Sequence, residues 1–166
     1  MDFFTPDPEC TADSVSQPME NVHHFFTSEK SLKVDTLLFY GSTHNIHLTF
    51  PACDHVREII VVEFLDKSMD YLDKWMKKDP EIFNWQKSIK SAHSHEETWE
   101  RWIANEEKAR KLIKKCIKLE LTESGPVALQ SLAKVDCLLS SYCLNFLCKD
   151  IDSFTASVKS MSSLLH

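Results

Sequence analysis

The stretch Glu58-Ile-Ile-Val-Val-Glu-Phe64 is the clearest strand in the sequence. Four β-branched apolar residues stand between two acids, a pattern typical of a strand that is buried on both faces of a sheet. Strands of this kind occur in parallel sheets that are covered by helices. The stretch therefore predicts an α/β fold.

The segments on either side of this strand alternate between helix and strand. Thr36–Tyr40 is a short apolar run that stops at a glycine, and it predicts a second buried strand. Thr43–Cys53 is ambiguous, because its apolar residues alternate as in a strand, whereas its place after a strand favours a short helix ended by Pro51. Asp66–Lys78 carries an apolar stripe at helical spacing, with Asp66 as a suitable N-cap, and predicts a helix.

The second half of the chain continues this alternation. It contains a predicted helix over Thr98–Lys115, a half-buried or edge strand over Cys116–Leu121, a turn at Ser124–Pro126, a buried strand over Val135–Ser140 and an amphipathic helix over Ile151–Leu165. Strands that alternate with helices favour a parallel sheet with right-handed crossovers. We therefore expect about four parallel strands with flanking helices.

The composition excludes several classes of protein. Glycine occurs only 2 times in 166 residues, which excludes a Walker A phosphate loop, a complete G-x-G-x-x-G fingerprint and a barrel built on glycine turns. The formal net charge of −6 argues against nucleic acid as a partner. Apolar runs of about six residues are too short to span a membrane. Because the acidic, proline-broken N-terminus resembles neither a signal nor a transit peptide, we expect a cytoplasmic protein.

The cysteine and histidine residues do not indicate a metal site. None of the 6 cysteines forms a C-x-x-C pair, so free thiols are expected. The segment His93–Glu97 contains two histidines and two glutamates, but no second ligand pair has matching spacing elsewhere. We expect this segment to be a solvated loop.

The carboxyl ends of the predicted strands are where a ligand is expected to bind. These ends carry Gly41 and Ser42, then Glu63, then Glu120, and then the run from Ser140 to Cys143. Glu63 follows Gly41 by about 20 residues, the spacing at which nucleoside-binding folds place a carboxylate on ribose hydroxyls. The same spacing is compatible with a strand that merely ends on a solvent-exposed acid.

Four segments resemble the nicotinamide N-methyltransferase family, which also includes the phenylethanolamine, indolethylamine and thioether methyltransferases. They are Ala52–Phe64, Asp70–Trp85, Thr122–Pro126 and Ala133–Leu144, and the stretch Leu-Asp-Lys-Trp-Met-Lys-Lys-Asp-Pro within the second is especially specific. The resemblance implies a partial Rossmann-like class I methyltransferase sheet that binds S-adenosylmethionine. It places a partial methyltransferase domain over residues 34–166, after an irregular N-terminal segment over residues 1–33.

The resemblance also implies a set of cofactor-binding positions. Gly41 and Ser42 match the start of the family's glycine loop, Glu63 the ribose-binding acid, Ser68 an adenosine contact, Glu120 and Leu121 the pair beside adenine, and Ser141 and Cys143 the segment after the last strand. Phe39 and Thr43 depart from the family, which usually has an acid and a second glycine there. A Cβ at Thr43 is expected to crowd a backbone that needs close approach.

The function implied by the resemblance is methyl transfer from S-adenosylmethionine to a pyridine or amine nitrogen of a small molecule. No residue is indicated as catalytic, and neither the acceptor nor the oligomeric state is indicated. The family continues beyond the last helix into further strands, whereas this sequence stops at His166. The alternative is therefore a truncated, catalytically inactive relative or an interaction fragment, with the fourth strand as an exposed edge.

Overall fold

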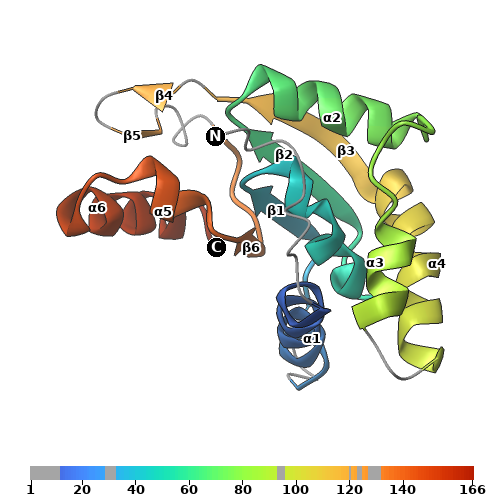
Figure 1. The fold of residues 1–166 in the computed structure, drawn as a ribbon. Helices are drawn as coiled ribbons and strands as arrows, with labels where there is room; N and C mark the ends of the chain where they lie inside the picture. Colours follow the sequence, from blue (N-terminus) through green and yellow to red (C-terminus); the bar gives the residue numbers. More distant parts are fainter. Residues whose placement is uncertain (1–11, 29–32, 93–95, 120, 123–124, 127–131) are drawn as a thin grey trace.

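The computed structural model describes residues 12–28, 33–92, 96–119, 121–122, 125–126 and 132–166. Its centre is a four-stranded parallel sheet in the order β3-β2-β1-β6 (Figure 1). The strands are β1 (Thr36–Tyr40), β2 (Glu58–Glu63), β3 (Ile113–Lys118) and β6 (Cys137–Ser140). This arrangement confirms the α/β, partial Rossmann-like sheet expected from the sequence.

Helices connect and cover these strands. They are α1 (Ala12–Ser28), the 3-10 helix η1 (Thr43–Ala52), α2 (Asp66–Met76), α3 (Trp85–Ala92), α4 (Glu96–Leu112), α5 (Cys143–Leu147) and α6 (Ile151–Ser162). A separate antiparallel pair joins β4 (Leu121–Thr122) to β5 (Gly125–Pro126). In the part of the chain that the structure describes, no helix is long and apolar enough to cross a membrane.

The two faces of the sheet bury different clusters of side chains. The larger cluster joins Leu37, Phe39, Ile59 and Val61 to Phe50, Leu72, Trp75 and Trp102 from η1, α2 and α4. The smaller cluster joins Leu38, Tyr40 and Val62 to Phe64, Leu119, Val135, Leu144, Met161 and Leu164. Neighbouring residues of one strand enter opposite clusters because side chains alternate along a strand. Figure 1 shows α5 and α6 beside β6, away from α3 and α4.

Asp136 fastens β6 to the start of β1. Its Oδ2 accepts hydrogen bonds from the main-chain amides of Asp35 and Thr36, at 3.0 and 2.9 Å. The chain then returns to the same place after α6, where the Val135 amide donates to the Leu164 carbonyl at 2.9 Å. Among the described strands, β6 is the outermost one on the far side of β1.

The N-terminal helix α1 was not expected from the sequence. The prediction of an irregular segment over residues 1–33 is wrong for residues 12–28, because Pro18 is accommodated inside α1. Val15, Met19 and Phe26 are buried on one side of this helix, which packs against η1 and α3. Their helical spacing places an apolar stripe on the core, and this burial outweighs the missing amide of proline. The domain boundary at residue 34 stays a prediction.

Other element boundaries also differ from the prediction. Pro51 lies inside η1 rather than ending it, and Leu65, not Asp66, is the N-cap of α2. β3 begins at Ile113 because α4 ends at Leu112 and passes directly into the strand. The short helices α3 and α5 were not predicted. His93 and His95 lie outside the described residues.

Candidate functional site

Gly41 forms the turn that ends β1, and the turn after β6 packs against it. Its φ of +149° is a conformation that favours glycine, and its amide donates to the Val62 carbonyl at 3.2 Å. A Cβ on Gly41 would lie 3.2 Å from the Cβ of Cys143 and 3.6 Å from the Ser141 carbonyl oxygen. The predicted positions Gly41, Ser141 and Cys143 therefore meet at one edge of the sheet.

This edge is the topological switch point of the sheet. β2 and β3 lie on one side of β1, whereas β6 lies on the other. Ligands of open α/β sheets bind outside the carboxyl ends of the strands where the order reverses. In this chain that place is between the turns that follow β1 and β6, and Tyr142 stands in the second turn with a φ of 57°. A positive φ at a bulky residue is a rare conformation that clusters at functional sites.

Glu63 ends β2 with a buried carboxylate. Its Oε2 accepts a hydrogen bond from the Thr43 amide at 2.8 Å, and its Oε1 accepts from the Phe64 and Leu65 amides at 2.7 and 3.3 Å. Only 2% of Glu63 is exposed, so the alternative of a solvent-exposed acid is wrong. Burial raises the pKa of this carboxyl, and the three amide hydrogen bonds oppose that rise.

Thr43 links the turn after β1 to the first turn of α2. Its Oγ1 donates to the Ser68 carbonyl at 2.6 Å, and both residues are buried. Ser42 caps η1, because its Oγ accepts from the His44 amide at 3.4 Å. The predicted positions Ser42, Glu63 and Ser68 thus lie on contacting turns. The sequence did not predict these contacts of Thr43. The only feature of the sequence that pointed to this residue was its place two residues after Gly41.

Two further positions were expected beside adenine. Glu120 lies outside the described residues, and Leu121 belongs to β4, which pairs with β5 and not with the main sheet. Their role stays a prediction. Cys143 is half-buried beside Gly41, and burial, followed by the charge of Glu63, raises the pKa of its thiol to about 12. A thiol with this pKa stays protonated near neutral pH and is a poor nucleophile.

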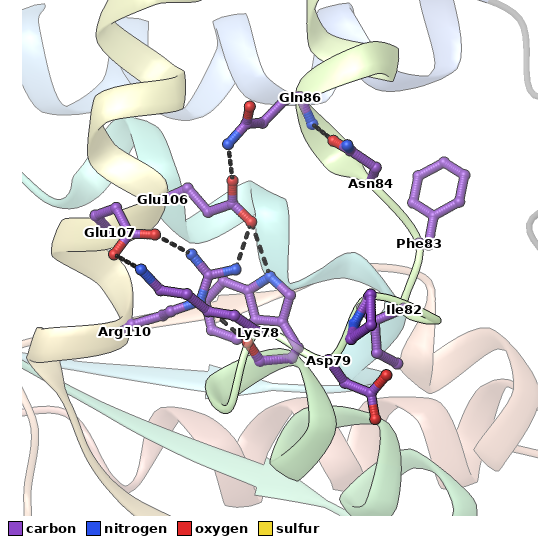
Figure 2. A pocket seen from close by; sticks show the side chains of 11 residues that line it. Lys78, Asp79, Ile82, Phe83, Asn84, Gln86, Glu106, Glu107 and Arg110 are labelled. Carbon is purple, nitrogen blue, oxygen red and sulfur yellow. Dashed lines mark hydrogen bonds and ion pairs between the residues drawn. The ribbon is translucent and has the colours of Figure 1, made fainter.

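A surface pocket of about 260 Å³ lies elsewhere, between the end of α2 and the helices α3 and α4. Figure 2 shows Glu106 between Gln86 and Arg110 in its wall. Glu106 accepts hydrogen bonds from the Trp75 ring nitrogen, Arg110 and Gln86 at 3.1, 2.7 and 3.2 Å. Arg110 also stacks over the Trp75 ring at 4.3 Å. These contacts tie three helices together, and we assign the network a structural role.

Comparisons with known proteins agree on one family. The family model described as "NNMT/PNMT/TEMT family" matches residues 2–166. The chain is 31% identical over 147 residues to nicotinamide N-methyltransferase of Homo sapiens, covering 89% of this chain and 55% of that protein. It is 30% identical over 160 residues to indolethylamine N-methyltransferase of Oryctolagus cuniculus, covering 96% of this chain and 60% of that protein.

A third relative matches at lower identity. The chain is 28% identical over 144 residues to phenylethanolamine N-methyltransferase of Homo sapiens, covering 86% of this chain and 50% of that protein. The chain therefore spans about half the length of the curated relatives it matches.

Proposed function

Because the chain belongs to the NNMT/PNMT/TEMT family, we propose that the turns around Gly41 and Glu63 form part of a binding site for S-adenosylmethionine. We further propose that the protein transfers a methyl group to a pyridine or amine nitrogen of a small molecule. The observation that carries this proposal is the meeting of Gly41, Glu63 and the turn after β6 at the switch point of the sheet.

The residues at this edge match an adenosyl ligand in kind. A ribose diol is recognised by a carboxylate that accepts from both hydroxyls, and Glu63 supplies one at the end of β2. Gly41 has no side chain, which lets the turn after β6 pack closely against the end of β1. One feature does not match, because the Thr43 amide already takes Oε2 of Glu63 and the carboxylate is buried.

The chain contributes position rather than proton transfer to such a reaction. When bound, S-adenosylmethionine supplies an electrophilic methyl group on a sulfonium. A pyridine nitrogen has a free lone pair and needs no general base, so the rate depends on proximity and alignment. The turn at Gly41 is suited to orient a ligand, because the turn after β6 packs against it and its amide is bonded to the Val62 carbonyl.

A titration tests this proposal. Purified chain is titrated calorimetrically with S-adenosylhomocysteine, and we expect binding that is lost in Glu63→Ala. The matched control is Glu58→Ala, at the opposite end of β2, which removes an acid of the same strand and leaves the carboxyl edge intact. Absence of binding to the folded wild-type chain would contradict the proposal.

A second candidate function is a non-catalytic relative that does not use the cofactor. The observation that favours it is the closed state of Glu63, whose oxygens are occupied by the protein's own amides. Transfer of a labelled methyl group to a pyridine or a primary amine distinguishes the candidates. Absence of both cofactor binding and methyl transfer in a folded chain, whichever acceptor is supplied, would favour the second.

A further inference from the structure

The carboxylate of Glu63 has too few free acceptor positions for a ribose diol. Its two oxygens offer about four lone-pair directions. The Phe64 and Leu65 amides occupy Oε1, and the Thr43 amide occupies one direction on Oε2. A vicinal diol brings two donors, whereas only one direction, on Oε2, is unoccupied, so one of these amides must leave before both hydroxyls can donate to the carboxylate. Departure of the Thr43 amide would open a second direction on Oε2, which could then accept from both hydroxyls.

Thr43 is the amide donor that can leave with the least disturbance. Phe64 and Leu65 follow Glu63 directly, and Leu65 is the N-cap of α2, so their amides are fixed by the chain itself. Thr43 comes from a different segment, the turn after β1, and reaches Glu63 across the edge of the sheet. Its displacement leaves β2 and α2 intact.

The hydroxyl of Thr43 holds this amide in place. Oγ1 donates to the Ser68 carbonyl at 2.6 Å, so the residue is anchored at its side chain to α2 and at its amide to Glu63. Thr43, Glu63 and Ser68 are all buried, which strengthens both hydrogen bonds. Together these contacts form a clasp over the carboxylate.

We propose that this Thr43 clasp controls access to Glu63, and that an adenosyl ligand binds only when the Thr43 amide leaves Oε2. The proposal rests on the proposed function, because it concerns the same site. It makes Thr43 the residue that sets the affinity of this chain for the ligand, through its hydroxyl rather than through its bulk.

The test compares variants of nearly equal shape. Thr43→Val removes the hydroxyl and keeps the volume, and we expect it to bind S-adenosylhomocysteine about tenfold more tightly than the wild type, the effect of losing one buried hydrogen bond. Thr43→Ser restores the hydroxyl and is expected to restore the wild-type affinity. Thr49→Val is the matched control, because Thr49 is equally buried and its Oγ1 donates to the Ile46 carbonyl at 2.7 Å within η1.

A second readout needs no ligand. Hydrogen exchange of the residue 43 amide reports directly on the bond to Glu63. We expect slow exchange in the wild type and in Thr43→Ser, and exchange about tenfold faster in Thr43→Val, for the same hydrogen-bond reason. Thr43→Gly, which removes the whole side chain, repeats both measurements if valine disturbs folding.

The outcomes separate this proposal from the proposed function. Equal affinities in the wild type and Thr43→Val, with binding still lost in Glu63→Ala, would overturn the clasp and leave the proposed function standing. Absence of binding in the wild type, Thr43→Val and Thr43→Gly, all of them folded, would overturn both. Tighter binding in Thr43→Val without faster amide exchange would also overturn the clasp, because the affinity would then have another origin.

Discussion

The two faces of the sheet bury similar residues but are covered to different extents. The larger cluster is closed by α1, η1, α2, α3 and α4, and it contains Trp75 and Trp102. The smaller cluster is covered by α5 and α6, where Ile151 remains 74% exposed and Val158 40%. Two neighbouring leucines of β1, Leu37 and Leu38, are completely buried on opposite faces.

The order of the strands explains this difference. The connections from β1 to β2 and from β2 to β3 run in one direction across the sheet, so right-handed crossovers place their helices on one face. The chain then returns past β2 and β1 to β6, which puts the following helices on the other face. Most of the helices therefore cover the first face, which buries the larger cluster, and these helices precede residue 113 in the sequence.

The leucine pair on β1 should give the largest difference between the faces. We expect Leu37→Ala to lower the free energy of unfolding by about 4 kcal/mol, because its neighbours in the larger cluster are fixed and cannot fill the cavity. Leu38→Ala should cost about 2 kcal/mol, since half-buried residues such as Ile60 and Leu138 can relax into the space. Guanidinium unfolding of both variants measures this difference. Equal losses in the free energy of unfolding would contradict the conclusion that the two faces are covered to different extents.

A second large loss of stability is expected from the Glu106 network, on the face of the sheet that buries the larger cluster. Glu106→Ala leaves the Arg110 guanidinium, whose side chain is 12% exposed, without its most buried partner. Glu107 still pairs with Arg110, but the Trp75 ring nitrogen and the Gln86 amide lose their acceptor, so we expect a loss of about 2 kcal/mol. Glu107→Ala is the control, because this carboxylate is 47% exposed and also pairs with Arg110. A similar loss in both variants, measured by urea unfolding, would show that burial of the pair is unimportant.

Acid should weaken the first face through His47. This ring is buried against Trp85 at 3.8 Å, and burial lowers its pKa from 6.5 to about 3. The unfolded chain binds a proton below pH 6.5 that the folded chain does not bind, so stability falls as the pH drops from 6.5 toward 3.

At pH 5 the cost is about 2 kcal/mol, and His47→Phe should abolish this part of the pH dependence. Thermal unfolding between pH 7 and pH 5 measures the slope. An unchanged slope in His47→Phe would assign the acid sensitivity to other groups.

The smallest effect is expected on the thinly covered second face. Ile151→Ser, in the first turn of α6, should change the free energy of unfolding by less than about 0.5 kcal/mol, because the side chain is largely in water already. Met161→Ala, in the same helix but buried, should cost more. A large loss of stability in Ile151→Ser would mean that Ile151 makes contacts beyond those described above.

The sequence predicted those elements whose signal is local. β1 and β2 could be located from their apolar runs, and Glu63 could be placed at the end of β2 because it closes that run. The start of β3 could not, because Lys114 and Lys115 continue the polar face of α4 without a turn residue between helix and strand. The burial of Glu63 was also inaccessible, since it depends on an amide from a turn 20 residues away.

The hydrogen bonds of Asp136 have a consequence for the order of folding. They close a loop of 100 residues between β6 and β1, whereas β1 and β2 meet across only 22 residues. The longer closure costs about 1.3 kcal/mol more in chain entropy, equivalent to about a tenfold slower encounter. We expect β6 to join the sheet late, and the turn at Tyr142 reaches Gly41 only with it. The candidate site is therefore assembled at the end of folding, after the larger cluster has already formed.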